Sequence, residues 1–454
     1  MKRILKGVRK KYFVLIGMTS MLFYGPVISV LAQTTMPITL ENVLTLGGAN
    51  NLTIVEYRER QELAAAELSK AKEWWLPEVY GGLQAHQLWG AVMNGNGRFF
   101  LDVTRSNQWL GLGLNAHWDF ADGIYATRAA SLQAQASRYL SEAERNKVLL
   151  QAIVTYYDLL MAQFQWQAYR DLSAQADTLA HQINIQVDAG LRYQSEALLA
   201  DGNRSHLQVE MLNAQREYNI ASAELLALLN MDQVQKLVSI DTILSPLDYD
   251  EGPITFSDTL YRNRPEIKAT EFEIRALETQ KKAFTTGLLI PELNVGTYGS
   301  YFGKINGNLT PMDPVAFPSP DGLNRTGELN ASLMWRIPLG ALAYDGDNRK
   351  YKSLIRIKHI ETEQTQAQIN KEISQARTRL AMGREQVQIA TKALELMKEA
   401  LDQSMGRQLL GTASPFEVFQ AQQFYLQAQL DYFKAIAGYN KAQFALKVAK
   451  GERL

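Results

Sequence analysis

Two stretches of this sequence are too long, and too free of helix breakers, to fold inside a compact globular domain. The first runs from Gly123 to about Val187, is rich in Ala, Gln, Leu and Arg, and has no internal Gly or Pro. The second runs from about 349 to 405 and contains only Gly383, which a helix tolerates. At 1.5 Å per residue, a helix of about 65 residues is a rod of roughly 100 Å. Such rods are typical of coiled coils and helical tubes, so a plain coiled-coil spacer is one interpretation.

The chain also repeats itself, with the same order of features in each half. Each half has a helix, a Pro-Glu break, two strand-like runs, a very long helix, a Gly break and a further helix. The matching positions include Gly190 with Gly411, Glu196 with Glu417, and Pro77-Glu78 with Pro291-Glu292. This pattern predicts a duplication of roughly 200 residues, with a first repeat at 33–253 and a second at 254–454.

Four shorter runs are typical of β-strands, two with clean alternation and two, near 78–90 and 292–303, that alternate less strictly. They lie near 78–90, 108–120, 292–303 and 328–339. In "LGLGLNAHWDF" and "LNASLMWRIPL" apolar residues alternate with small or polar ones, which fits a half-buried strand or a strand that crosses a bilayer. Outer-membrane barrels need at least about eight strands, so strands of this kind would require partner copies. Three copies would supply twelve strands.

Most of the tryptophans lie in or beside these runs, some near the loop after 90 and others toward the helices. Aromatic residues at both ends of the strands form the interfacial belts of membrane β-barrels. A soluble β-sandwich core is the alternative. The residues expected at the membrane interface are Trp74, Trp75, Trp89, Trp109, Trp118 and Trp335.

The N-terminus has the features of a secretory signal peptide. "MKRILKGVRKK" carries six basic and no acidic residues, an apolar run follows, and "VLA" precedes Gln33. We expect cleavage near Ala32, with an uncleaved membrane anchor as the alternative. Without residues 1–32 the chain keeps 41 basic and 47 acidic residues, a net charge of −6. An acidic chain is poorly suited to nucleic acid, because phosphate contacts need clustered Lys and Arg.

No catalytic or metal-binding constellation stands out. The chain has no Cys, so it can form no disulfide and carry no lipid anchor on Cys. Its five His are scattered without a pair at i, i+4, and the Walker, dinucleotide and G-x-S-x-G motifs are absent. We therefore expect no enzyme, no cofactor and no metal site.

The order of elements resembles that of the TolC family of outer-membrane efflux proteins. The motifs that carry the resemblance are "LPEVY" and "IPELN" at the entries to the strands, "NRPEI" at 263–267, and the two Gly breaks. The resemblance implies a mainly α fold with transmembrane β. In the family, a homotrimer forms a 12-stranded outer-membrane β-barrel that continues into a long periplasmic α-helical barrel, with residues 231–253 in a belt around its middle.

The resemblance also implies a function and partners. Members are passive exit ducts of tripartite efflux pumps or type I secretion systems. They sit in outer-membrane lipid and dock to a periplasmic adaptor (membrane fusion) protein and an inner-membrane transporter. A function of a different class, a periplasmic coiled-coil scaffold or adaptor without a pore, is the alternative.

In this family the Gly breaks are hairpin tips at the periplasmic mouth. The residues that would face the adaptor are Gly190, Leu191, Ser195, Gly411, Thr412, Ser414 and Pro415. The acid six residues after each Gly would lie near the constriction, which implies Glu196 and Glu417. Some members have an Arg two residues after the second Gly, where this chain has Ala413, and the resemblance leaves Arg192 or Arg407 as the replacement.

Glu417 has a second interpretation. The run "SPFE" at 414–417 is a capping box, in which the Ser oxygen caps the new helix, Pro takes its first position and Glu reaches back. The first break has Tyr193 at the cap position and still keeps Glu196. A helix cap and a pore acid therefore both remain as roles for Glu417.

Overall fold

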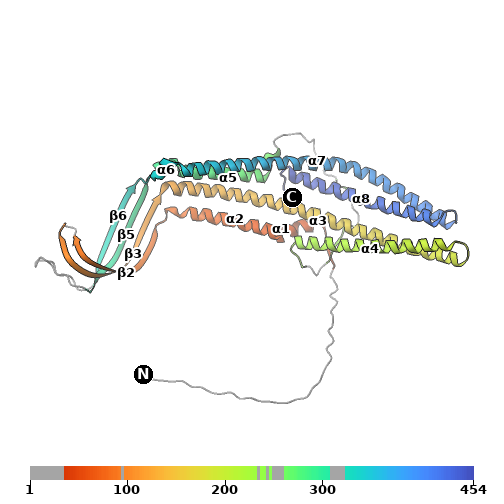
Figure 1. Cartoon of the computed structure of the whole chain (residues 1–454), viewed down its shortest axis with the longest axis horizontal. Coiled ribbons are helices and arrows are strands. Elements are labelled where there is room, and N and C mark those ends of the chain that lie inside the picture. Colours follow the sequence, from red (N-terminus) through yellow and green to blue (C-terminus); the bar gives the residue numbers. More distant parts are fainter. Residues whose placement is uncertain (1–34, 94–96, 233–235, 242–244, 248–259, 307–322) are drawn as a thin grey trace, which may run out of the picture.

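The protein is elongated, with a β-sheet at one end and helices along the rest of its length (Figure 1). The structure is a computed structural model that describes residues 35–93, 97–232, 236–241, 245–247, 260–306 and 323–454. The expected signal peptide at 1–32 and its cleavage site lie outside these residues, as does much of 231–253. The prediction of a mainly α fold is confirmed.

Two long helices run along most of the molecule. α3 (Phe120–Asp188) has 69 residues and α7 (Gly346–Leu409) has 64, so both rods expected from the sequence form. α3 begins directly after a strand, where the Asp119 side chain accepts a hydrogen bond of 2.9 Å from the amide of Asp122. This cap satisfies one of the amides that the first turn of a helix leaves free.

Each rod folds back as a helical hairpin. α4 (Gln194–Leu228) returns along α3, and α8 (Pro415–Ala449) returns along α7 (Figure 1). The other helices of the described residues are α1 (Leu40–Asn50), α2 (Leu52–Ala71), α5 (Pro265–Ala283) and α6 (Leu339–Tyr344). The same residues include the short 3₁₀ turns η1 (Glu73–Trp75), η2 (Leu260–Asn263) and η3 (Thr286–Leu289).

The largest buried cluster lies at the middle of the molecule, where α3, α4 and α8 meet two short strands. β1 (Thr35–Ile38) and β4 (Lys236–Ser239) pair in parallel there. The buried Gln163 side chain on α3 accepts from the Ser239 amide at 2.8 Å and donates to its carbonyl at 3.1 Å. The Gln163 side chain thus bonds to the backbone of β4 as a neighbouring strand would. The buried amide and carbonyl of Ser239 are satisfied in this way.

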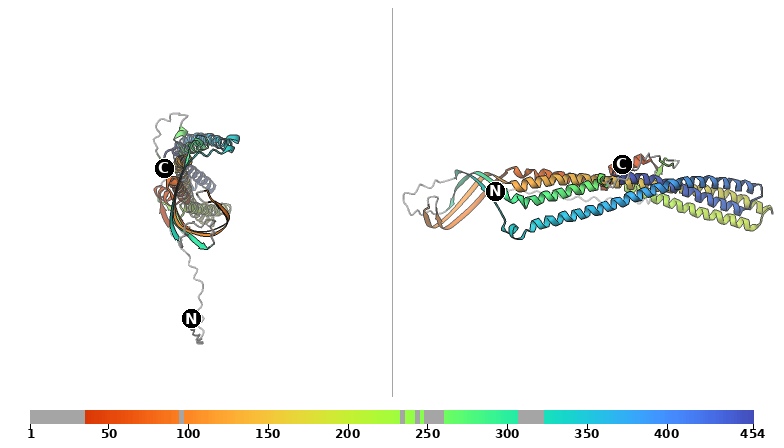
Figure 2. Two further views of the ribbon diagram at one scale, coloured as in Figure 1. Left: turned by 90° about the vertical axis from the view of Figure 1, so that its left-hand side faces the viewer. Right: turned by 90° about the horizontal axis from the view of Figure 1, so that it is seen from above.

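The sheet at the end of the molecule has four antiparallel strands in the order β2-β3-β5-β6. Their bounds are β2 (Glu78–Met93), β3 (Phe99–Asp119), β5 (Glu292–Asn306) and β6 (Leu323–Met334). The central pair, β3 and β5, joins the two halves of the chain, with Asp119 opposite Glu292. β2 and β6 are the edges, and Figure 2 shows that the sheet is curved when viewed along the molecule.

β6 ends earlier than the alternating pattern indicates. The strand was expected to run to 339, but it ends at Met334, and α6 begins at Leu339. Met334 pairs with Glu292, the first residue of β5, and Pro291 before it has no amide hydrogen to extend the ladder. Residues 335–338 therefore have no partner strand despite their alternation.

Gly123 fixes the junction between the sheet and α3. A Cβ at this position would lie 2.2 Å from the Trp74 ring, so only Gly lets that ring lie against the first turn of α3. The Trp74 ring also meets Phe120 edge to face, with centroids 5.8 Å apart. Within the described residues, none of the helices has an apolar stretch of membrane-spanning length.

Candidate functional site

The register of the sheet gathers apolar residues on one face. Residues directly opposite each other in an antiparallel pair share a face, and Val79, Leu114, Thr297 and Leu329 form one such row across all four strands. Val79 is 73% exposed and Leu329 is 75% exposed. Further exposed leucines on this face are Leu83, Leu110, Leu112 and Leu333. An apolar face of this size is unusual on a protein surrounded by water.

The opposite face carries small and polar residues. Its rows include Tyr80, Gly113, Tyr298 and Glu328, and the Tyr80 ring lies so close over Gly113 that a Cβ there would be 2.3 Å from the ring. In a neighbouring row, the Gly296 amide donates to the Asn330 side chain at 3.1 Å. The two faces of the sheet thus differ in polarity, one being apolar and the other small and polar.

The tryptophans expected at the membrane interface occupy different environments. Trp89, Trp75 and Trp335 are exposed, with Trp89 lying in β2 opposite Thr104. The Trp118 indole donates to the Trp75 carbonyl at 2.7 Å, which fixes this pair at the helix-proximal end of the sheet. Trp74 packs against Gly123 as described above, and Trp109 lies within β3 opposite Gln84. Their interfacial role stays a prediction.

The two Gly breaks lie together at the end of the molecule farthest from the sheet (Figure 1). Gly190 and Gly411 both have φ of +72°, a left-handed conformation that favours Gly. Both turns bond in the same way: the Gly amide donates to the carbonyl three residues back, and the next amide to the carbonyl five residues back. The sequence-predicted tip residues Leu191, Ser195, Thr412, Ser414 and Pro415 surround these turns.

Each tip pairs its acid with an Arg of the same hairpin. Arg192 donates to Glu196 at 3.2 Å and to Gln186 at 2.5 Å, and its side chain is largely buried. Arg407 donates to Glu417 at 2.5 Å, and this pair is more exposed to solvent. The order is reversed between the tips, because Arg192 follows its Gly and Arg407 precedes its own. The more exposed pair contributes at most about 1 kcal/mol to stability, since water screens it.

Of the two hydrogen bonds of the proposed capping box, the one accepted by Ser414 forms at the second tip. The Ser414 hydroxyl accepts from the Glu417 amide at 3.3 Å, so Ser414 caps α8. The Glu417 carboxylate turns to Arg407 instead of reaching back to the Ser414 amide. Tyr193, at the equivalent position of the first tip, makes no side-chain cap.

Sequence reasoning missed a set of apolar side chains at the tips. Tyr193, Leu409, Leu410 and Phe416 are exposed there, with Leu410 at 80%. The sequence did contain a signal for this set, because apolar residues stand directly beside the Gly of each turn. Exposed apolar residues at the end of a rigid hairpin are suited to contact with another protein.

Comparison with known proteins shows that this fold is similar to the folds of solved membrane channels. No protein-family model and no curated protein sequence matches the chain. Among solved structures, the CmeC outer membrane channel of Campylobacter jejuni matches with a TM-score of 0.74 at 18% identity, over 91% of this chain and 85% of CmeC. CusC matches with a TM-score of 0.74 at 15% identity, over 91% and 92% of the two chains.

A third solved structure matches over the same share of this chain. VceC, an outer membrane protein of Vibrio cholerae, has a TM-score of 0.70 at 15% identity, over 91% of this chain and 96% of VceC. The fold is therefore that of outer-membrane channels. At the level of the fold, this confirms the resemblance to the TolC family that the sequence motifs indicated.

Proposed function

We propose that this protein is a passive exit duct of the outer membrane, serving a tripartite efflux pump or a type I secretion system. The observation that carries the proposal is the four-stranded sheet, whose exposed apolar face is joined directly to helical rods. Lipid is the environment that such a face requires, and the fold shared with outer-membrane channels supports the same conclusion.

The unpaired edges of the sheet support a homotrimer. Within the described residues, β2 and β6 each pair on one side only. Backbone groups without partners are unstable in lipid, so the sheet must close with other copies. Pairing of β6 with β2 of the next copy closes a barrel, and three copies give twelve strands around the pore.

The helices carry complementary apolar surfaces for the same assembly. A groove between α7 and α8 is lined by residues that include Ile389, Met397 and Phe424. On α4, several apolar side chains are exposed in the described protomer: Leu198, Leu199, Val209, Leu212 and Ile220. Packing of α4 from one copy against the α7–α8 groove of the next would bury both surfaces and close the α-helical barrel.

The hairpin tips are proposed to dock the periplasmic adaptor. In an outer-membrane duct they lie at the end of the rods away from the lipid, where the adaptor and the inner-membrane transporter are reached. The exposed Leu410 and Phe416 would supply apolar contacts, beside the rigid turns at Gly190 and Gly411.

Membrane extraction and conductance together test the duct. We expect the protein to fractionate with the outer membrane, to require detergent for extraction, to migrate as a trimer, and to conduct ions in planar bilayers. A monomer released without detergent would exclude the duct and favour a soluble scaffold. That scaffold is disfavoured because it would leave Val79, Leu112 and Leu329 in water.

Paired substitutions at the tips test whether Glu196 and Glu417 act on ions in the pore. In this structure each acid is neutralised by an Arg, so Arg192→Ala and Arg407→Ala should free the acids and strengthen block by divalent cations. The double substitution Glu196→Ala with Glu417→Ala should weaken that block in planar bilayers. Glu395→Ala, an exposed acid away from the tip, is the matched control. Unchanged block in all tip variants would leave these residues a structural role in the turns.

A further inference from the structure

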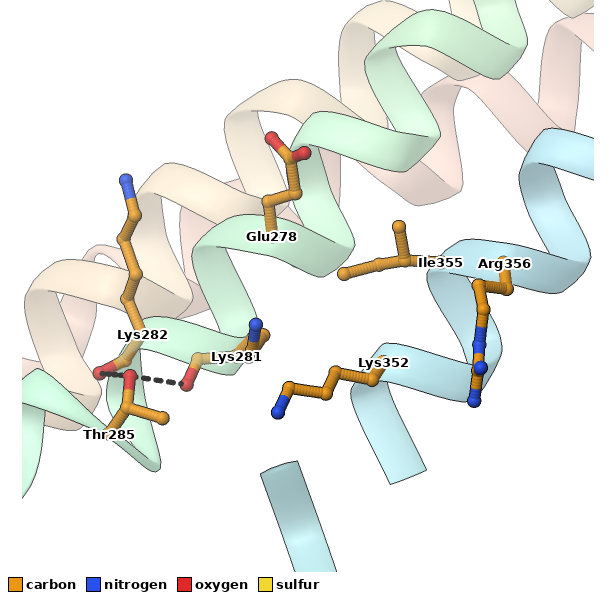
Figure 3. Close-up of a pocket in the computed structure, with 7 residues that line it drawn as sticks. All are labelled: Glu278, Lys281, Lys282, Thr285, Lys352, Ile355 and Arg356. Carbon is orange, nitrogen blue, oxygen red and sulfur yellow. Dashed lines mark hydrogen bonds between the residues drawn. The ribbon is translucent and has the colours of Figure 1, made fainter. Parts of the chain in front are cut away.

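A basic cavity of about 560 Å³ lies between α5 and α7, close to the end of the rods that meets the sheet. Its lining residues recur every three or four positions, so each helix contributes one face. The lining consists of Glu278, Lys281, Lys282 and Thr285 on α5, with Lys352, Ile355 and Arg356 on α7. Apart from Lys282, whose amine points away (Figure 3), three cationic side chains therefore accompany a single acid.

Two contacts between α5 and α7 bound the cavity. On the side toward the sheet, the rings of Phe284 and Tyr351 stack with centroids 5.4 Å apart. On the other side, Lys358 pairs with Glu273 at 2.9 Å. These contacts join α5 and α7 on either side of the cavity, and Figure 2 shows that the two helices lie farther apart toward the sheet. The basic faces are thus kept opposite each other without closing on one another.

In the described part of the chain, the cations in the cavity have no acidic partner, unlike Lys358 farther along α7. Among the described residues, Lys281, Lys352 and Arg356 form no ion pair, whereas Lys358 has two. Figure 3 shows Lys352 extending from α7 toward α5, with Lys282 directed away. Like charges that line one cavity repel one another, and a bound anion would relieve that repulsion.

The geometry points to a binding site for the phosphate-bearing head group of an anionic phospholipid. This inference rests on the proposed function, because it requires the sheet to span the membrane and so place the adjoining helix ends near the lipid head groups. Exposed apolar side chains between the sheet and α7 lie at the same end, namely Trp335, Leu339 and Tyr344. Phe284, which is also partly exposed beside the cavity, offers a contact for an acyl chain.

Lipid retention by the purified full-length trimer tests this site. The probe is phosphatidylglycerol against phosphatidylcholine in mixed nanodiscs, followed by native mass spectrometry of the lipids that stay bound. The test variant is Lys281→Gln, Lys352→Gln and Arg356→Gln together. The matched control is Arg384→Gln, Lys392→Gln and Lys398→Gln, three exposed cations farther along α7.

We expect the native protein and the control to prefer phosphatidylglycerol, and the test variant to lose about a hundredfold in apparent affinity, as removal of three charges near an anionic surface implies. If the test variant retained as much phosphatidylglycerol as the native protein does, the proposal would be overturned. Displacement of the lipid by millimolar glycerol phosphate alone would assign the cavity to soluble phosphates and also overturn it. Failure of the native protein to enter nanodiscs would instead contradict the proposed function.

Discussion

The substitution Leu114→Arg is expected to keep the protein out of the outer membrane, whereas Asn115→Arg is expected to leave insertion intact. Leu114 lies on the apolar face of β3, in the row with Val79 and Leu329. A cation on the lipid face of a membrane strand costs about 2–4 kcal/mol near the middle of the bilayer. A trimer would carry this cost three times, once in each copy.

Asn115 is a closely matched control because it occupies the next position of the same strand at nearly the same depth. It faces the polar side and lies opposite Glu78, so an Arg there gains an acidic neighbour. Outer-membrane fractionation and quantitative immunoblotting of both variants give the comparison. Equal amounts of the two variants in the outer membrane would show that the apolar face of the sheet does not contact lipid.

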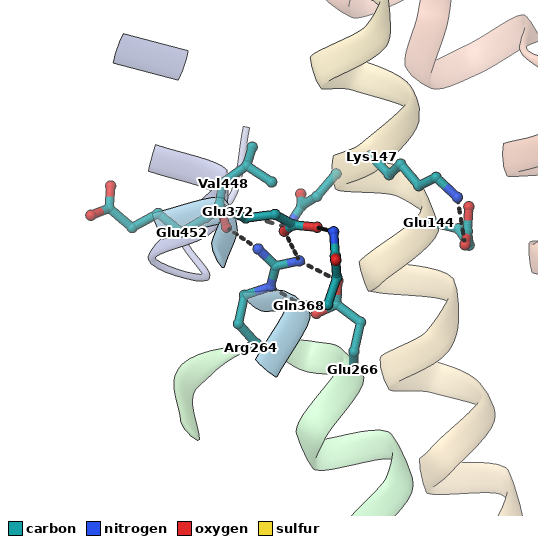
Figure 4. A network of polar contacts seen from close by, with 9 residues as sticks. Glu144, Lys147, Arg264, Glu266, Gln368, Glu372, Val448 and Glu452 are labelled. Carbon is teal, nitrogen blue, oxygen red and sulfur yellow. Dashed lines mark hydrogen bonds and ion pairs between the residues drawn. The ribbon is translucent and has the colours of Figure 1, made fainter. Parts of the chain in front are cut away.

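The substitution Arg264→Ala is expected to be the most destabilising change in the helical part. Arg264 belongs to the "NRPEI" motif, and its side chain is only 8% exposed. Figure 4 shows its guanidinium at the centre of a network. It donates to both carboxylate oxygens of Glu266, at 2.7 and 3.0 Å, and to the Val448 carbonyl at 3.2 Å. It also pairs with Glu372 on α7 at 3.3 Å.

Removal of this cation would leave two carboxylates close together and a carbonyl without its donor. Loss of one partner from a fully buried pair costs about 3–5 kcal/mol, and the partial exposure of Glu266 and Glu372 reduces this to about 2–3 kcal/mol. We expect the temperature of heat-induced loss of helical circular dichroism to fall by about 3–6 °C.

Two control variants separate the network from a general loss of charge. Arg262→Ala removes an exposed cation two residues away and should leave the unfolding temperature unchanged. Arg264→Lys keeps the charge but cannot reproduce the two-pronged contact with Glu266, so it should lie between the native protein and Arg264→Ala. Equal unfolding temperatures for Arg262→Ala and Arg264→Ala would show that the network does not hold α8 in place.

Local sequence features were enough to predict the rods and the tips. Long runs without Gly or Pro give α3 and α7, and Gly190 and Gly411 mark the turns, because helix formation and its termination depend on neighbouring residues. Clean alternation located β3 and β6, and weaker alternation located β2 and β5. The predicted end of β6 was wrong because a strand also needs a neighbouring strand to pair with. Alternation in the sequence does not show where that neighbour ends.

The features that the sequence could not predict depend on distant residues. The order of the strands, with β3 beside β5, and the pairing of Thr35–Ile38 with β4 are tertiary contacts between segments far apart in the chain. The ion pair of Arg407 with Glu417 spans ten residues across a turn, so its formation depends on the geometry of the hairpin. The basic cavity likewise arises only when α5 and α7 face each other.

The central pairing of the sheet also sets an order of folding. His117 on β3 contacts Asn294 on β5, 177 residues later in the chain, whereas each helical hairpin closes over a short turn. Contacts between distant residues form more slowly than local ones, because a long loop must close first. We therefore expect the hairpins to fold before the sheet, so that its apolar face is assembled last. Late assembly shortens the time in which that surface could aggregate.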